Sequence, residues 1–153
     1  MRRKDAPSRS QLQSRGQSGK FLLDTSALLA FIEDEEGADQ VEEAITQGDT
    51  VVPWPALLEV YYITLREKGQ AEANLRYALL RQLPVDIRWE MDEPTLLTAG
   101  EIKAKHRISL ADAMIAAYAI RNDAVLIHKD PEFETLASLL PMSPLPYKPT
   151  SDR

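Results

Sequence analysis

Short apolar runs alternate along the chain with longer segments in which apolar and polar residues mix. The short segments predict strands at 20–24, 50–53, 84–89 and 124–128, with a proline-limited edge strand at 142–147. The longer segments predict helices at 25–32, 39–47, 55–66, 70–82, 94–105, 109 to about 122, and 134–140. In helix 70–82 we expect Leu75, Ala78 and Leu79 to face the core. Strands that alternate with helices predict an α/β fold built on a parallel sheet.

The segment 109–120 is apolar on almost every side, which is typical of a buried helix. It contains a single charged residue, Asp112. An ionised carboxylate is costly to bury unless a cation or several donors meet it. Ser109 and Asp112 also fit a capping box, in which Asp112 has only a structural role. The spacing alone leaves both interpretations open.

Three further acids lie in similarly apolar surroundings. Asp24 and Asp130 each follow a predicted buried strand, at the edge where open α/β sheets bind ligands. Both also fit a helix N-cap, a role that is compatible with ligand binding. Glu59 has no Lys or Arg three or four positions away on its helix. We therefore expect Glu59 to face a cleft rather than solvent.

Carboxylates that meet at one sheet edge repel one another unless a cation lies between them. Oxygen ligands favour Mg²⁺ or Mn²⁺, whereas a chain with no cysteine and only two histidines gives little support for zinc. The sequence has no GxxxxGK[ST], GxGxxG or GxSxG motif, which argues against nucleotide-binding and serine-hydrolase folds. A phosphoaspartate enzyme with Asp24 as nucleophile stays an alternative, although Ser26 stands where a second acid is usual.

Charge is distributed unevenly along the 153 residues. Residues 1–20 hold six basic side chains and one acid, a net charge of +5, and the remainder holds 12 basic and 23 acidic side chains, a net charge of −11. We expect a disordered basic arm at 1–19, one domain at 20–147 and a frayed tail at 148–153. The chain has no cysteines and no apolar run of membrane length, and no apolar core follows the basic first residues as in a secretory signal. We therefore expect a cytoplasmic protein with no signal sequence and no membrane contact.

Taken in order, the acidic motifs resemble those of PIN-domain proteins, and most closely the toxin ribonucleases of VapBC-type toxin–antitoxin modules. The motifs are Leu23–Ser26, Leu58–Glu59, Ser109–Ala117 and Lys129–Phe133. The resemblance implies a three-layer α/β/α sandwich with a central, mainly parallel sheet. It also implies a Mg²⁺- or Mn²⁺-dependent endoribonuclease that hydrolyses phosphodiester bonds of an RNA substrate.

The resemblance carries over to individual residues. It implies catalytic metal ligands at Asp24, Glu59, Asp112 and Asp130. Ser26 matches the small polar residue after the first acid, Glu132 sits where many members have a further Asp, and His128 replaces a frequent Thr or Ser. We expect these three residues beside the substrate or behind the metal ligands. Members are commonly homodimers inhibited by a small antitoxin protein, which implies the same partners here, with Glu33–Glu36 as a candidate contact.

Two other functions stay open at this stage. One is a catalytically silent PIN-like binding module, in which the acids hold a structural cation or an arginine-bearing partner. The unusual His128 is the feature that favours it. The other is a nuclease directed at DNA, because carboxylates and a metal do not by themselves recognise the RNA 2′-hydroxyl.

Overall fold

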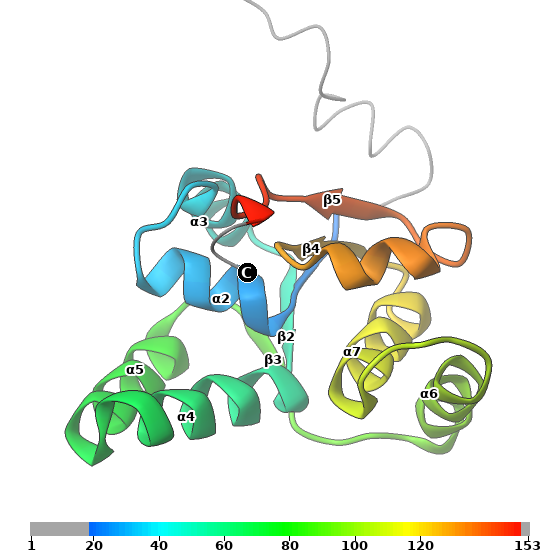
Figure 1. Ribbon diagram of the computed structural model, residues 1–153, viewed down its shortest axis with the longest axis horizontal. Coiled ribbons are helices and arrows are strands. Elements are labelled where there is room, and N and C mark those ends of the chain that lie inside the picture. Colours follow the sequence, from blue (N-terminus) through cyan, green and yellow to red (C-terminus); the bar gives the residue numbers. More distant parts are fainter. Residues whose placement is uncertain (1–18, 151–153) are drawn as a thin grey trace, which may run out of the picture.

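The computed structural model describes residues 19–150, and at its centre lies a five-stranded sheet in which all paired strands are parallel (Figure 1). The strands are β1 (Phe21–Leu23), β2 (Thr50–Pro53), β3 (Asp86–Arg88), β4 (Val125–His128) and β5 (Met142–Pro144). Strands β2 and β4 are buried along their whole length. Burial on both faces explains their continuous apolar runs, which is typical of parallel sheets. The predicted α/β class is confirmed.

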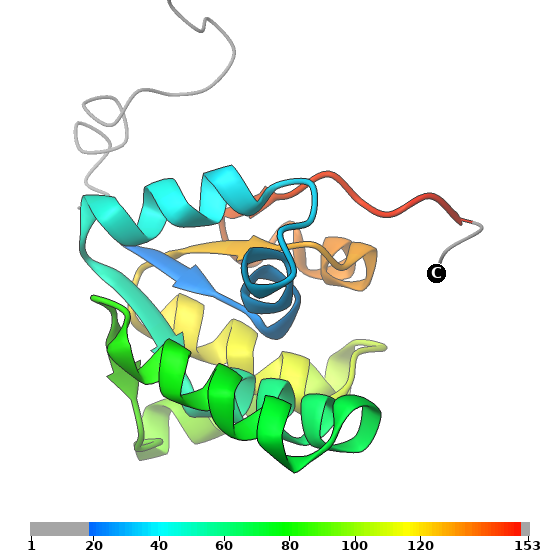
Figure 2. The same ribbon diagram turned by 90° about the vertical axis from the view of Figure 1, so that its left-hand side faces the viewer.

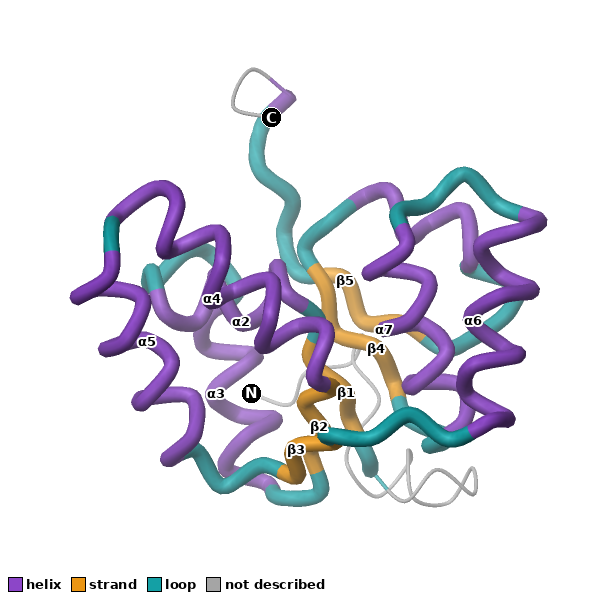
Figure 3. The backbone as a smooth tube through the Cα atoms, turned by 90° about the horizontal axis from the view of Figure 1, so that it is seen from below, coloured by secondary structure: helices purple, strands orange, loops and turns teal. Residues whose placement is uncertain are grey.

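Helices cover both faces of the sheet, which confirms the predicted three-layer sandwich. They are α2 (Thr25–Ile32), α3 (Ala38–Gln47), α4 (Trp54–Lys68), α5 (Gln70–Gln82), α6 (Glu93–Lys105) and α7 (Leu110–Arg121), with a 3₁₀ helix, η1 (Pro131–Leu136). Figure 3 shows α2 to α5 on one side of the strands and α6 and α7 on the other. Helix α4 packs along α5, as Figure 2 shows, and α6 packs along α7.

The order of strands creates a switch point between β1 and β4. The order is β3-β2-β1-β4-β5, so the chain moves from β1 to β2 and β3 and then crosses to β4 and β5 on the other side. Leu23 pairs with Ile127, so the next residues, Asp24 after β1 and His128 at the end of β4, lie side by side at the carboxyl edge of the sheet. In open α/β sheets, the crevice at the carboxyl ends of such strands is where ligands bind.

Helix α5 buries a different face from the one predicted. The residues expected in the core are exposed instead, namely Leu75 (62%), Ala78 and Leu79 (43%). Those that are buried are Ala73, Arg76 and Leu80. The helix has apolar residues on two faces, and its main neighbour is α4 rather than a strand. Arg76 can lie on the buried face because its guanidinium pairs with Glu33 at 3.1 Å and with Glu72 at 3.3 Å.

The last third of the chain departs from prediction in two boundaries. The helix expected at 134–140 is η1, which begins earlier because Asp130 caps it and Pro131 occupies its first turn. The edge strand expected at 142–147 pairs only over β5, whose last residue is Pro144. Prolines at 144 and 146 have no N–H to donate, so they limit how far this ladder extends.

The predicted basic arm at 1–19 lies outside the described residues except for Gly19, and the predicted tail at 148–153 is described only to Thr150. Both therefore stay predictions. Within residues 19–150, no helix combines the length and the apolar character that a membrane crossing requires. The longest of these helices, α4, has 15 residues.

Candidate active site

Asp24 is a carboxylate held almost out of reach of solvent, with 2% of its surface exposed. It follows β1 and caps α2, because its Oδ1 accepts the N–H of Ala27 at 2.8 Å. The Ser26 hydroxyl lies 2.8 Å from both carboxylate oxygens and donates to them. Burial nevertheless raises the pKa of Asp24 to about 8 against these hydrogen bonds, and the charge of Asp112 adds to the rise. The N-cap role that the sequence allowed for Asp24 is present.

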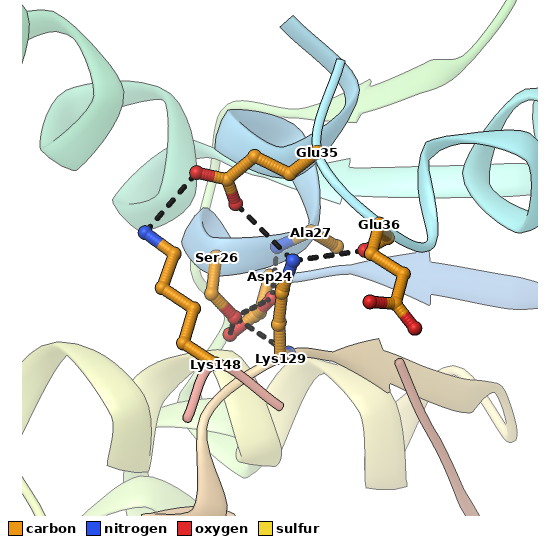
Figure 4. A network of polar contacts seen from close by, with 7 residues as sticks. All are labelled: Asp24, Ser26, Ala27, Glu35, Glu36, Lys129 and Lys148. Atoms are coloured by element: carbon orange, nitrogen blue, oxygen red, sulfur yellow. Dashed lines mark hydrogen bonds and ion pairs between the residues drawn. The ribbon is translucent and has the colours of Figure 1, made fainter. Parts of the chain in front are cut away.

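Ser26 also ties the ends of β1 and β4 together. Its Oγ accepts the backbone N–H of Lys129 at 2.8 Å while its proton points at Asp24 (Figure 4). The N–H of Asp24 donates to the Ile127 carbonyl at 3.2 Å. One hydroxyl thus bridges the first acid and the loop that carries Asp130, which fixes the two strand ends relative to each other.

Asp112 lies in the capped first turn of its helix, and its carboxyl group is also in surroundings that disfavour a negative charge. Its backbone N–H donates to Ser109 Oγ at 3.1 Å, so Ser109 is the N-cap of α7. The carboxyl group lies partly buried in the first turn. Burial raises its pKa to about 7, and the charges of Glu59, Asp130 and Glu132 contribute to the rise. A capping box therefore does not explain the position of this acid by itself.

Three of the predicted acids converge. Asp112, Asp130 and Glu132 each offer a carboxylate oxygen, and these oxygens lie within 4.8 Å of one another. Asp130 caps η1 by accepting the N–H of Glu132 at 3.0 Å, so the 3₁₀ helix places Glu132 beside it. Three carboxylates this close, from α7 and from the segment after β4, match the spacing of ligands around one cation.

Glu59 and Asp24 flank this group rather than join it. Glu59 is partly buried on α4 and accepts the hydroxyl proton of Thr25 at 2.5 Å. The charge of Glu59 raises the pKa of Asp112, and the charge of Asp112 in turn raises the pKa of Asp24. The sequence reasoning missed Thr25, although a hydroxyl at the first position of α2, directly after Asp24, was a visible signal for a contact of this kind.

His128 ends β4 and is fully buried. Its Nδ1 accepts the N–H of Asp130 at 3.2 Å, and its ring lies against Phe133 and Tyr147, with centroids 5.0 and 6.0 Å away. Burial lowers the pKa of the imidazole, so the ring is neutral at neutral pH. His128 thus lies behind Asp130 and takes part in holding the turn.

The charged turn at 33–36 is largely paired within the described chain. Glu35 meets the Nζ of Lys129 at 3.4 Å and of Lys148 at 3.1 Å, and the Nζ of Lys129 also donates to the Glu36 carbonyl at 2.8 Å (Figure 4). Glu33 pairs with Arg76. The contacts of Lys129 attach the turn to the loop that carries Asp130. A partner that bound Glu33 or Glu35 would therefore have to displace the Arg or Lys side chain that already pairs with that acid.

The donor set of the site fits a hard divalent cation. It is built of carboxylate oxygens with hydroxyl groups behind them, and such oxygens favour Mg²⁺ or Mn²⁺. Burial is the main cause of the raised pKa values of Asp24 and Asp112, and neighbouring carboxylates that share the site without a counter-charge add to the rise. The ligands that the fold brings together best are Asp112, Asp130 and Glu132.

Sequence and fold together define the family. Residues 21–139 match the sequence profile of the PIN domain, so the chain belongs to the PIN-domain family. No protein of curated function matches the chain significantly in sequence.

The solved structures that resemble this fold include VapC toxins in VapBC complexes. One is VapBC2 from Rickettsia felis bound to a DNA fragment from its promoter, with a TM-score of 0.68, 16% identity, and coverage of 82% of this chain and 98% of that one. DNA-bound VapBC from Salmonella typhimurium gives a TM-score of 0.64 and 18% identity over 82% and 97%. VapC20 from Mycobacterium tuberculosis, a sarcin-ricin loop cleaving toxin, gives 0.61 and 15% over 76% and 94%. At these identities the likeness establishes the fold.

Proposed function

We propose that this protein is a metal-dependent endoribonuclease and the toxin of a toxin–antitoxin module. The observation that carries the proposal is the convergence of Asp112, Asp130 and Glu132 within 4.8 Å, at the switch point of a PIN fold. Two further carboxylates interact electrostatically with this group, since Glu59 raises the pKa of Asp112 and Asp112 raises that of Asp24. A structural salt-bridge cluster would contain cations, whereas no Lys or Arg pairs with Asp112, Asp130 or Glu132 among the described residues.

Asp112, Asp130 and Glu132, whose oxygens converge, would hold a Mg²⁺ or Mn²⁺ ion, with Asp24 and Glu59 as further ligands or as positioners of water. Such an ion, when bound, lowers the pKa of a water and neutralises phosphate charge. Ser26 donates to the two oxygens of Asp24 and so keeps that carboxyl group oriented. Thr25 holds Glu59 in the same way from the start of α2. Ser109 fixes the first turn of α7 and so the direction of Asp112.

The proposed partners are an antitoxin and a second copy of the chain, with the cytoplasm as the place of action. Two of the similar structures, those from Rickettsia felis and Salmonella typhimurium, are VapBC complexes, which supports the antitoxin. The surface supports association, because large apolar side chains are exposed on α4 to α7, namely Leu58, Tyr62, Leu75, Leu79, Leu96, Leu97 and Leu110. Sedimentation equilibrium of the isolated chain tests the dimer, and a monomer at micromolar concentrations would exclude it.

The nuclease is tested by incubating the purified chain with matched RNA and DNA pools in Mg²⁺, Mn²⁺ or EDTA. The proposal predicts discrete RNA fragments that need the metal, and DNA that stays intact. Cleavage of DNA in preference to RNA would indicate the DNA-directed alternative. Cation-dependent stabilisation of the chain without cleavage of either pool would indicate a silent binding module.

A further inference from the structure

One ring nitrogen of His128 makes a hydrogen bond, and the other is buried without a hydrogen-bond partner among the described residues. Its Nδ1 accepts the backbone N–H of Asp130 at 3.2 Å. Its Nε2 is buried and has no hydrogen-bond partner among residues 19–150. The rest of the ring packs between Phe133 and Tyr147. An apolar residue would fill the same space without leaving a buried donor unpaired.

The direction of the hydrogen bond defines the state of the ring. A backbone N–H can only donate, so Nδ1 must be the unprotonated acceptor, and a neutral imidazole then carries its proton on Nε2. Presenting Nδ1 to Asp130 therefore leaves the buried Nε2–H without a hydrogen bond, which costs free energy. This cost is unexplained if His128 serves only to fill the core at the end of β4.

The contact runs from a side chain to the N–H two residues ahead. Asn, Asp, Ser and Thr make the same local bond in Asx and ST turns. The imidazole nitrogen of His128 thus takes the place that a side-chain oxygen has in those turns. The turn that it closes ends at Asp130, whose Oδ1 in turn accepts the N–H of Glu132. Both acids belong to the carboxylate group that includes Asp112.

We propose that His128 is a positioning residue, whose Nδ1 fixes the turn that presents Asp130 and Glu132 to the metal ion. This inference rests on the proposed metal-dependent function. It assigns to His128 an effect on metal affinity that is separate from any effect on the stability of the fold. Groups behind metal ligands commonly change affinity in this way, because they orient the ligand.

The test uses two nearly isosteric substitutions in the full chain. H128N supplies an acceptor oxygen for the Asp130 N–H as an Asx turn does, whereas H128L supplies none. Without metal, a buried leucine is at least as stabilising as an asparagine whose amide needs partners. We therefore expect the melting temperature of H128L to equal or exceed that of H128N.

Affinity for Mn²⁺, measured by calorimetry, should follow the opposite order. We expect H128N to stay within about threefold of the wild type and H128L to bind at least about tenfold more weakly. The inference is overturned if H128L binds Mn²⁺ as tightly as H128N, or if affinity simply follows melting temperature.

A second readout separates this inference from the proposed function. The ¹⁵N spectrum of metal-free wild type should show the Nε2–H tautomer of His128, and the Asp130 amide should exchange faster in H128L than in H128N. Wild type that binds Mn²⁺ while His128 carries its proton on Nδ1 overturns the inference and leaves the function standing. Wild type with the expected tautomer but no Mn²⁺ binding overturns the function and with it the positioning role.

Discussion

At the scale of single residues, burial disfavours the charged forms of Asp24 and Asp112. Burial raises the pKa of Asp24 to about 8 and that of Asp112 to about 7, although Ser26, Ala27 and Ser109 offer hydrogen bonds that oppose the rise. Both groups thus hold protons near neutral pH when no cation is bound. A divalent ion must displace these protons, so metal binding and protonation compete for the same oxygens.

The metal-free protein should lose stability as the pH rises from about 6.5 to 8. In this window folded Asp24 keeps a proton that the unfolded chain has already lost, so raising the pH favours unfolding. The slope is at most about 1.4 kcal/mol per pH unit for this group, and the melting temperature should fall by about 5 °C. Below pH 6.5 His128, whose pKa is lowered, acts in the opposite sense.

Melting curves across this window, with and without Mn²⁺, measure the effect. Mn²⁺ should flatten the slope, since its affinity rises with pH as the carboxyl groups ionise. D24N should flatten the slope in the absence of metal, because an amide has no proton to lose. Asp112, whose pKa is about 7, should keep its own share of the slope below pH 7 in D24N. A slope above pH 7 that is unchanged in D24N would show that another group is responsible.

Replacing Ser26 by alanine should weaken metal binding more than it weakens the fold. S26A removes the donor to Asp24 and the acceptor for the Lys129 N–H, so the ends of β1 and β4 lose their bridge. We expect Mn²⁺ affinity to fall by about tenfold. The control is S138A at an exposed serine. Equal Mn²⁺ affinities of S26A and S138A would contradict this role.

At the scale of elements, α5 shows what the apolar pattern left undetermined. Apolar residues recur with a helical period on two faces of this helix. Which face is buried depends on the contact with α4 and on the pairing of Arg76 with Glu33, 43 positions away. Neither partner is visible in a local window of sequence. Strand and helix types were predictable because they depend on local periodicity, whereas faces depend on neighbours.

Two adjacent leucines of α5 test the observed face. L80A removes a side chain that is 2% exposed and should cost about 2–4 kcal/mol of unfolding free energy. L79A alters a side chain on the other face and should change the stability by less than about 1 kcal/mol. Denaturant unfolding of the isolated chain measures both. A larger loss in L79A than in L80A would mean that α5 packs on the face first predicted.

The features of the site also divide into those that local sequence signals predict and those that depend on the three-dimensional structure. The positions of Asp24, Asp112 and Asp130 at element starts were predictable, since caps and strand ends have local signals. The closeness of Glu132 to Asp112 was not, because it depends on η1 being a 3₁₀ helix that begins at Pro131. The contact of His128 with Asp130 required the turn geometry itself.

At the scale of the whole molecule, the strand order explains why acids far apart in sequence meet. The switch point between β1 and β4 brings residues 24 and 130 to adjacent strand ends, and α7 returns Asp112 to the same edge. The acidic character of residues 21–153 has a consequence for function. A polyanion such as RNA would approach a repelling surface unless cations lie at the site, so activity should depend strictly on a divalent metal.

The central claim is tested most directly by RNA cleavage in Mn²⁺ by the matched variants D112N and D123N. Both remove one carboxylate from the region of α7, but Asp112 belongs to the converging acids, whereas Asp123 is exposed beyond the other end of the helix. Asp123 has a φ of 52°, which asparagine tolerates well.

We expect D112N to reduce the cleavage rate at least about 100-fold while its metal-free melting temperature stays equal or rises, because one repelling charge is gone. D123N should cleave RNA as the wild type does. Cleavage by D112N at the wild-type rate would contradict the account, because the carboxylate group that the fold assembles would then have no part in the reaction.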